Sequence, residues 1–245
     1  MFLKRKMINK NLTFIIPAAG KSSRFKSEKS KIFFHYRGKS LISHVVEKCF
    51  KYSNKIIVIT NRKNISELKK LLSVYKKINF TFVLQNRARG MGHAISLGLK
   101  NVQTKYSSVI WSDQIFLTSK TIEKTFNFFN SNHSLLCFPV YKKKLPYVYI
   151  LRDRNQKFKD IIQTREGAPI VKMGESDCGF FVFQSSIIKL LLQKLIKTKK
   201  IMTKKTNEID FLKAFKYFNT HGSVDILKAT NHNDTIGINS IEDLA

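Results

Sequence analysis

Short apolar runs alternate with amphipathic segments over the first 140 residues, and this alternation constrains the fold more than any other feature. The apolar runs have the length of strands and lie at 12–18, 55–60, 79–85, 107–113 and 134–140. Between them, apolar residues recur at helical spacing over 40–50, 64–75, 92–100 and 118–130, with Ser40 as the expected N-cap of the first helix. Strands that alternate with helices are typical of a parallel sheet with helices on its faces. The sequence therefore predicts an α/β fold with a mostly parallel central sheet flanked by helices.

The pattern changes after residue 141. Runs at 147–153 and 178–184 predict strands of a mixed region, and 186–196 and 207–218 predict helices. Short strands are expected at 223–229 and 234–238, followed by a last helix over 239–245. No internal repeat and no linker separates the two parts, and 245 residues with 43% hydrophobic side chains suffice for one full core. We therefore expect a single domain over 1–245, with halves at about 11–140 and about 141–245.

The chain carries a formal net charge of +29, which indicates either a nucleic-acid partner or a generally lysine-rich surface. The lysines are spread along the whole chain together with many asparagines and isoleucines, as AT-rich codon usage would produce. No compact arginine-rich stripe or known nucleic-acid module occurs, so nucleic acid is not the expected partner. A positive field does, however, speed the arrival of anionic substrates.

Cysteine usage and hydropathy favour a cytoplasmic protein. Cys49, Cys137 and Cys178 are far apart and form no CxxC pair, which favours buried, reduced thiols. No apolar run reaches the roughly 18 residues that a membrane span needs. The basic first ten residues lead into a short apolar run that we interpret as a strand rather than a signal peptide, and no membrane partner is expected.

The segment FIIPAAGKSSRFKSEKSK, 14–31, ends an apolar strand on small residues and then supplies hydroxyls and cations. It is not a Walker A loop, because Ile15 stands where that loop needs glycine. GMGHAI at 90–95 likewise fails the dinucleotide fingerprint at its last position. Small residues let a ligand approach the backbone, and successive N–H groups with Lys21, Arg24 and Lys31 would neutralise phosphates. An ordinary solvent-facing loop is the alternative.

These residues resemble the nucleotidylyltransferases that make nucleotide sugars, most closely the uridylyltransferase domain of N-acetylglucosamine-1-phosphate uridylyltransferases. That family's signature is L-A-A-G-x-G-T-R-M followed by P-K, and PAAGKSSRF…SK keeps its spacing to Arg24 and Lys31. Ser22 and Ser23 replace Gly-Thr, and Ser30 replaces the proline. LQNRARGMGHA, WSD, ESDCGFFVF, NEIDFLKAF and TIGINSIEDL follow in the family's order, so the resemblance spans about 14–244.

The resemblance implies a single-domain glycosyltransferase-A-like, Rossmann-like nucleotidyltransferase fold. Its reaction joins a nucleoside triphosphate to a sugar-1-phosphate with Mg²⁺ and releases pyrophosphate. The nucleotide would lie in the half at about 11–140 and the phosphorylated acceptor in the half at about 141–245. A homo-oligomer remains open.

The resemblance also implies site residues. Catalytic roles fall to Arg24, Lys31 and Asp113, and metal binding to Asp113 and Asn239. Nucleotide binding is expected from Pro17, Ala18, Ala19, Gly20, Lys21, Ser22, Gln85, Gly90, Met91, Trp111 and Ser112. Sugar binding is expected from Gln163 and Asp177.

Several of these residues have alternative roles. Asp113 could cap the helix that begins near Thr118, and Asn239 could be the N-cap of the last helix while also binding metal. Trp111 could belong to the core or line the ribose pocket, and Gln85 could bond only to backbone. His93 is expected to be a packed helix residue rather than a catalyst.

Departures from the family pattern put the acceptor and the base in question. Tyr147 and Tyr149 stand where the family has glycines close to the acceptor, Gln163 replaces an acid, and Asp177 replaces an asparagine. These exchanges replace hydrogen-bond donors by acceptors and the reverse, so we expect the phosphorylated substrate to be a different one. The base could be uracil, cytosine, thymine or guanine. Two rival functions are a cytidylyltransferase for an alcohol phosphate such as choline phosphate, and a non-catalytic basic protein that binds nucleotide or nucleic acid.

Overall fold

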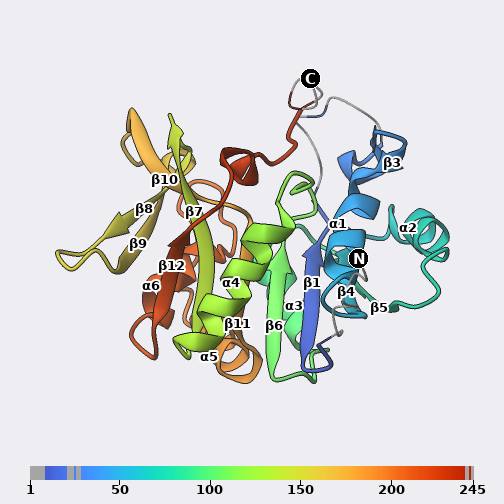
Figure 1. Ribbon diagram of the computed structural model, residues 1–245, viewed down its shortest axis with the longest axis horizontal. Helices are drawn as coiled ribbons and strands as arrows, with labels where there is room; N and C mark the ends of the chain where they lie inside the picture. The colour runs from blue at the N-terminus through green and yellow to red at the C-terminus, as the bar shows by residue number, and fades with distance from the viewer. Residues whose placement is uncertain (1–8, 21–24, 26–28, 241–242, 244–245) are drawn as a thin grey trace, which may run out of the picture.

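A central mixed sheet organises the part of the chain that the structure describes, which in this computed structural model is residues 9–20, 25, 29–240 and 243. Eight strands form the sheet, with the order β10-β7-β11-β6-β1-β4-β5 and β12 paired to β7 (Figure 1). β1 (Leu12–Pro17), β4 (Lys55–Thr60), β5 (Asn79–Leu84) and β6 (Tyr106–Ile110) are parallel neighbours. Every residue of β1 is buried, as its continuous apolar sequence predicts for a strand covered on both faces.

The second half of the chain completes the sheet mainly with antiparallel pairs. β11 (Phe180–Gln184) runs antiparallel to β6 and to the start of β7 (Leu136–Lys144). β10 (Met173–Asp177) runs antiparallel to the end of β7, and β12 (Val224–Lys228) lies parallel to β7. β8 (Val148–Arg152) and β9 (Phe158–Gln163) form a separate hairpin. The predicted α/β fold with a mixed, mostly parallel sheet is confirmed.

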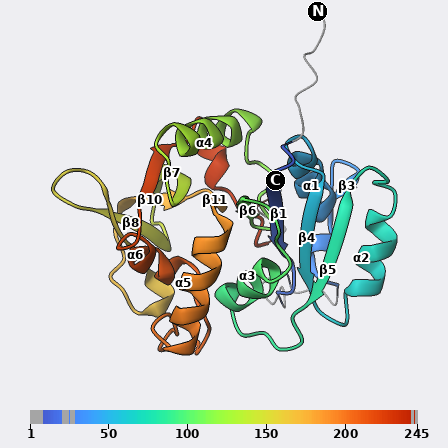
Figure 2. The same ribbon diagram turned by 90° about the horizontal axis from the view of Figure 1, so that it is seen from below.

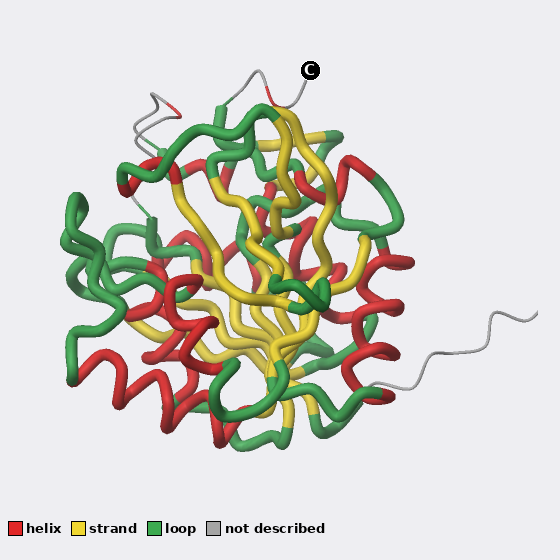
Figure 3. The backbone as a smooth tube through the Cα atoms, turned by 90° about the vertical axis from the view of Figure 1, so that its left-hand side faces the viewer, coloured by secondary structure: helices red, strands yellow, loops and turns green. Residues whose placement is uncertain are grey.

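Helices cover both faces of the sheet, so that a core lies on each side of it (Figures 2 and 3). α1 (Leu41–Phe50), α2 (Ile65–Leu72) and α4 (Ser119–Ser131) pack on the face that receives Phe14 and Ile16. α3 (Met91–Leu99), α5 (Ser185–Lys197) and α6 (Phe215–Phe218) pack on the opposite face, which receives Ile15. Successive β1 side chains therefore enter different cores, as strand geometry requires. None of the described helices is long and apolar enough to span a bilayer.

Short elements make the connections. β2 (His35–Tyr36) and β3 (Lys39–Ser40) form a hairpin whose two loop residues, Arg37 and Gly38, both have positive φ. The side chain of Ser40 accepts a hydrogen bond from Ser43 N, which confirms it as the N-cap of α1. The described 3-10 turns are η2 (Lys31–Phe33), η3 (Thr164–Glu166), η4 (Leu212–Ala214) and η5 (His232–Thr235).

One expected element is wrong in its extent and another in its type. The helix expected over 207–218 begins only at η4 and α6, because Asn207 has a positive φ and the Asp210 carboxylate accepts from Leu212 N and Lys213 N. The strand expected over 234–238 is replaced by η5, since Asn231 and Asp234 form a capping box there. The last expected helix includes residues outside the described ranges. The strands β9 and β10 were not expected from the sequence.

A buried carboxylate fixes the path of the C-terminal segment. Asp234 is fully buried and accepts hydrogen bonds from Thr118 N at 2.7 Å, Thr121 Oγ1 at 2.5 Å and Asn231 N at 3.1 Å. These bonds tie η5 to the start of α4. The chain then continues to Ile238, whose N–H donates to Asp113 O at 3.1 Å at the end of β6.

Asp234→Ala should lower the free energy of unfolding by about 2–3 kcal/mol, because buried donors would lose their shared acceptor. Urea denaturation monitored by circular dichroism measures the change. Thr235→Ala is the matched control, since that hydroxyl bonds only to His232 O within the same turn. Equal stability of the two variants would contradict the proposed anchor.

Candidate active site

A cleft of about 530 Å³ opens at the carboxyl ends of the parallel strands. Ligand sites of open α/β sheets lie at this edge. The cleft is lined from the first half of the chain by Pro17, Ala18, Ala19 and Gly20 after β1, by Lys31, by Gln85, Gly90 and Met91 after β5, and by Trp111, Ser112 and Asp113 after β6. From the second half, Gln163, Asp177 and Asn239 line it. All expected site residues within the described ranges thus share one cleft, whereas Lys21, Ser22 and Arg24 lie outside those ranges.

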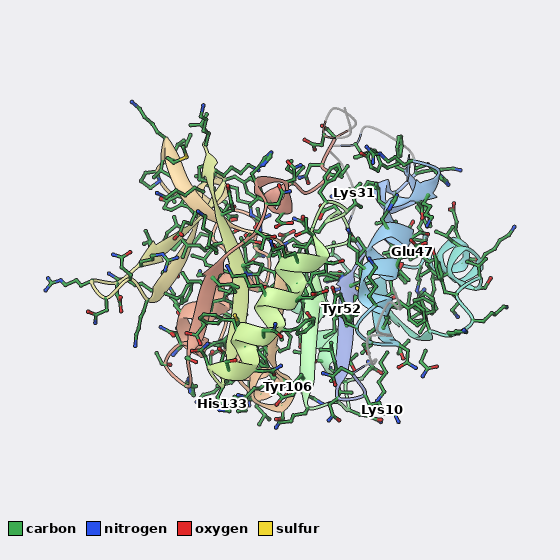
Figure 4. The ribbon with its side chains drawn as sticks, viewed as in Figure 1. Lys10, Lys31, Glu47, Tyr52, Tyr106 and His133 are labelled. Carbon is green, nitrogen blue, oxygen red and sulfur yellow. The ribbon has the colours of Figure 1, made fainter. Side chains whose placement is uncertain are left out.

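Three segments far apart in the sequence meet at the ammonium group of Lys31, which Figure 4 shows above the ends of the parallel strands. Lys31 Nζ lies 2.5 Å from Asp113 Oδ2, 2.9 Å from Ile238 O and 3.5 Å from Asn239 Oδ1. The side chains of Lys31 and Asp113 are only 17% and 16% exposed. The structure therefore brings Asp113 and Asn239, expected from the sequence to share a metal, to the same cation.

The oxygen atoms around this ammonium group are of the kind that binds a hard divalent cation. A carboxylate, an amide oxygen and a backbone carbonyl are all oxygen ligands of the kind that Mg²⁺ accepts. Asn239 Nδ2 donates to Gly237 O at 2.9 Å, which leaves Asn239 Oδ1 facing the cation. No cluster of three or more His, Cys, Asp or Glu side chains occurs among the described residues.

Gln85 presents an oriented amide on the nucleotide side of the cleft. Its Nε2 lies 3.1 Å from Gly90 O and 3.0 Å from His93 Nδ1. Burial, with the charges of Arg89 and Lys100, lowers the pKa of His93, so the neutral ring accepts from the amide. With both amide hydrogens engaged, Gln85 Oε1 is the atom of this amide that can accept a hydrogen bond from a ligand in the cleft.

The loop after β5 packs tightly on the segment before η4. Gly90 has φ +90°, and a Cβ there would lie 2.6 Å from Ile209 O. Gly92 N donates to Ile209 O, and Ile209 N donates to Arg89 O, each at 2.8 Å. Only glycine fits at position 90, both for its backbone angle and for this contact.

Acidic and amide side chains dominate the acceptor side of the cleft. Gln163 Nε2 donates a short hydrogen bond to Asp210 Oδ2, and both residues are buried. Arg165 lies 3.7 Å from Glu208. Asp177 Oδ1 accepts from Gly179 N at 2.8 Å. Burial raises the pKa of Asp177 to about 6, and the charge of Asp113 adds weakly to this increase. The hydrogen bond from Gly179 N and the charge of Lys143 act in the opposite direction.

Trp111 belongs both to the core and to the cleft wall. Its ring packs against Phe181 and Phe211, with centroid distances of 5.0 and 6.4 Å, while the residue also lines the cleft. Trp111 N donates to Gly179 O, and a Cβ at Gly179 would lie 2.5 Å from the indole. The two roles left open by the sequence are therefore compatible.

A second cavity of about 540 Å³ adjoins the cleft. Tyr147 and Asn239 line both cavities, and Lys143, Gly237 and Asp243 line the second one. Tyr147 is 54% exposed, so its ring stands at the boundary between the two spaces.

Several cleft residues had no clear signal in the sequence. His93 does not line the cleft, and its place in α3 with a hydrogen bond to Gln85 agrees with the expected packed helix residue. Glu208 and Asp210 lie in a segment expected to be helical, and Arg165 lies in η3. Their positions depend on contacts between distant segments, which local patterns do not encode.

Comparisons with known proteins relate the chain to one family and to longer relatives. The family described as MobA-like NTP transferase domain matches residues 14–175, more than half of the chain. A Bifunctional protein GlmU from Caldicellulosiruptor saccharolyticus is 25% identical over 245 residues, covering 95% of this chain and 50% of that protein. The chain thus spans about half the length of the curated relatives it matches.

Solved structures share the fold. UDP-glucose pyrophosphorylase complexed with UDP-glucose superposes with a TM-score of 0.71 at 18% identity, covering 97% of this chain and 96% of that one. A 4-diphosphocytidyl-2C-methyl-D-erythritol synthase from Anaerococcus prevotii superposes with a TM-score of 0.67 at 17% identity, covering 96% and 95%. At these identities the likeness establishes the glycosyltransferase-A-like fold alone.

Asp177→Asn should stabilise the fold at pH 8 by roughly 1–3 kcal/mol. A raised carboxyl pKa favours folding while the group is protonated, and this contribution is lost as pH rises through about 6. Asparagine stays neutral and keeps an oxygen for Gly179 N, so its advantage should disappear near pH 4. Urea denaturation of both proteins at pH 4, 6 and 8 measures this, and a difference independent of pH would contradict it.

Proposed function

The chain belongs to the MobA-like NTP transferase family, and from this premise we propose that it joins a nucleoside triphosphate to a sugar-1-phosphate. The products would be a nucleotide sugar and pyrophosphate. The observation that carries the proposal is the convergence of Lys31, Asp113 and Asn239 from distant segments inside one cleft. In this arrangement residues of about 11–140 bind the nucleotide and residues of about 141–245 bind the acceptor.

The proposed reaction is a displacement at the α-phosphorus. An oxygen of the sugar phosphate forms a bond to the α-phosphorus. The bond from the α-phosphorus to the oxygen that bridges it to the β-phosphorus breaks, and pyrophosphate leaves with the electron pair. The nucleophile is already an anion, so no general base is needed. Rate acceleration then comes from positioning and charge neutralisation.

The residues that meet at the cation position have separate roles in this proposal. Asp113 and Asn239 hold Mg²⁺, with Ile238 O beside them. When bound there, the ion would supply positive charge that neutralises the reacting phosphates. Lys31 neutralises charge that builds on the α-phosphate during attack. Lys21 and Arg24, outside the described ranges, are proposed to take the departing pyrophosphate.

The nucleotide is proposed to enter with its base toward Gln85. Gln85 Oε1 accepts an N–H of the base, because His93 and Gly90 O hold the amide nitrogen. Gly90 and Met91 line the same wall, and Trp111 and Ser112 lie toward the ribose. Pro17, Ala18, Ala19 and Gly20 offer the small surface along which the nucleotide approaches the end of β1.

A second candidate acceptor is a phosphorylated amino alcohol such as choline phosphate. The acceptor side carries Asp177, Glu208 and Asp210 against Arg165, an excess of acid in a chain of net charge +29. The ring of Trp111 lines the same cleft. Carboxylates and an aromatic face suit a cationic head group, whereas Gln163 and Asp177 equally suit sugar hydroxyls.

Pyrophosphate release should be detected with one of UTP, CTP, TTP or GTP when Mg²⁺ and a suitable acceptor are present. The acceptor panel comprises glucose-1-phosphate, N-acetylglucosamine-1-phosphate and choline phosphate. Turnover with a sugar-1-phosphate supports the main proposal, and turnover with choline phosphate alone supports the second candidate. No turnover, together with salt-sensitive binding of RNA or DNA, would instead indicate a non-catalytic basic binding protein.

Asp113→Asn should reduce kcat by about 100-fold or more, because the amide keeps the shape but loses the charge at the cation position. Steady-state kinetics of pyrophosphate release provide the measurement, and thermal unfolding verifies the fold. Asp160→Asn is the control, since Asp160 pairs with Lys216 outside the cleft. Near-normal kcat in Asp113→Asn would show that the metal position is misassigned.

A further inference from the structure

The ammonium of Lys31 occupies the point where a metal would have to bind. Its contacts with Asp113 Oδ2, Ile238 O and Asn239 Oδ1 match the three hydrogens of an ammonium group. A Mg²⁺ ion bound to the same oxygens would lie about 2.0–2.1 Å from each. The ammonium and the metal would then overlap, so the two cations exclude each other at these oxygens.

Backbone hydrogen bonds hold the main chain of Lys31 in the turn η2, so we consider movement of its side chain alone. Phe33 N donates to Ser30 O, and Phe34 N donates to Lys31 O, so the turn η2 is closed on both sides of Lys31. Ile32 and Phe33 are buried in the core next to α1. A lysine stem has four rotatable bonds, so its ammonium can move by several ångströms from a fixed backbone.

The charge of the whole chain affects a free metal ion and a nucleotide in opposite ways. A chain of net charge +29 repels a free divalent cation and attracts a polyanionic triphosphate. Gly20, Ser30 and Lys31 all line the cleft, so a phosphate bound at the end of β1 would share the cleft with the Lys31 side chain.

We propose that Lys31 is a tethered cation that fills the metal position of the nucleotide-free protein and leaves it when a triphosphate binds. The carboxylate of Asp113 then never lies in the cleft without a counter-charge. Metal enters together with the nucleotide, and Lys31 moves onto the phosphates as the metal takes its place. This inference rests on the proposed metal site but not on any acceptor or turnover.

Binding of Mn²⁺ to the nucleotide-free protein tests the proposal directly. Electron paramagnetic resonance of free Mn²⁺ gives the Kd without any activity measurement. Lys31→Met should bind Mn²⁺ at least about tenfold more tightly than the wild type, because the competing ammonium is gone. Lys31→Gln, which keeps a hydrogen-bond donor without the charge, should also bind more tightly and serves if the methionine variant unfolds.

Lys143→Met is the matched control for a general field effect. Lys143 lines the adjoining cavity together with Asn239, and no described contact joins it to the three oxygens around Lys31. Its substitution removes the same charge from the neighbourhood and should change the Mn²⁺ Kd by less than about threefold. Equal tightening in Lys143→Met and Lys31→Met would overturn the tethered-cation proposal.

Two further measurements complete the test. A non-hydrolysable triphosphate should tighten Mn²⁺ binding to the wild type and remove most of the advantage of Lys31→Met. Adding Asp113→Asn to Lys31→Met should abolish the gained affinity, since the ion binds at that carboxylate. An unchanged Kd in Lys31→Met, or gained affinity that survives the loss of Asp113, would refute the proposal. Failure of the acceptor panel would leave all of these results interpretable.

Discussion

The ion pair between Lys31 and Asp113 is the interaction on which the rest of the site depends. It joins residues 82 positions apart, and the same ammonium reaches Asn239, 208 positions away. The turn η2, the segment after β6 and the C-terminal segment thereby meet at one edge of the sheet. Asp234 holds that last segment against α4, so the fold brings the amide to the cleft before any ligand binds.

The acceptor side shows a different balance between stability and function. Asp177 remains in an environment that disfavours its charge, and its replacement by a neutral amide would ease that cost. Carboxylates kept at a cost within a cleft mark functional positions more often than structural ones. The carboxylate of Asp210, in contrast, accepts hydrogen bonds from Gln163, Leu212 N and Lys213 N. These bonds hold the cleft wall in position.

Sequence patterns predicted the parts of the molecule that local physics determines. β1 and β4 were recognisable because each is apolar on both faces, and Ser40 because a hydroxyl precedes an amphipathic helix. Asp113 and Asn239 were placed by resemblance, and the structure brings them together. β9 escaped prediction because its apolar residues do not alternate regularly with its polar ones, and β10 because it is mostly polar. The helix expected over 207–218 starts later than predicted because the Asp210 carboxylate accepts from Leu212 N. The hydrogen bond between His93 and Gln85 could not be predicted from hydrophobic periodicity, because periodicity indicates only which residues share a helix face.

The packing of Gly90 on Ile209 joins two segments that line the cleft. The loop that carries Gly90 also holds Gln85, and the segment that carries Ile209 continues into Asp210 and so to Gln163. A displacement of either segment is transmitted to the other through backbone hydrogen bonds. In the proposed reaction, selectivity for the base and selectivity for the acceptor would therefore be linked, and a change of one substrate would call for compensating change around the other.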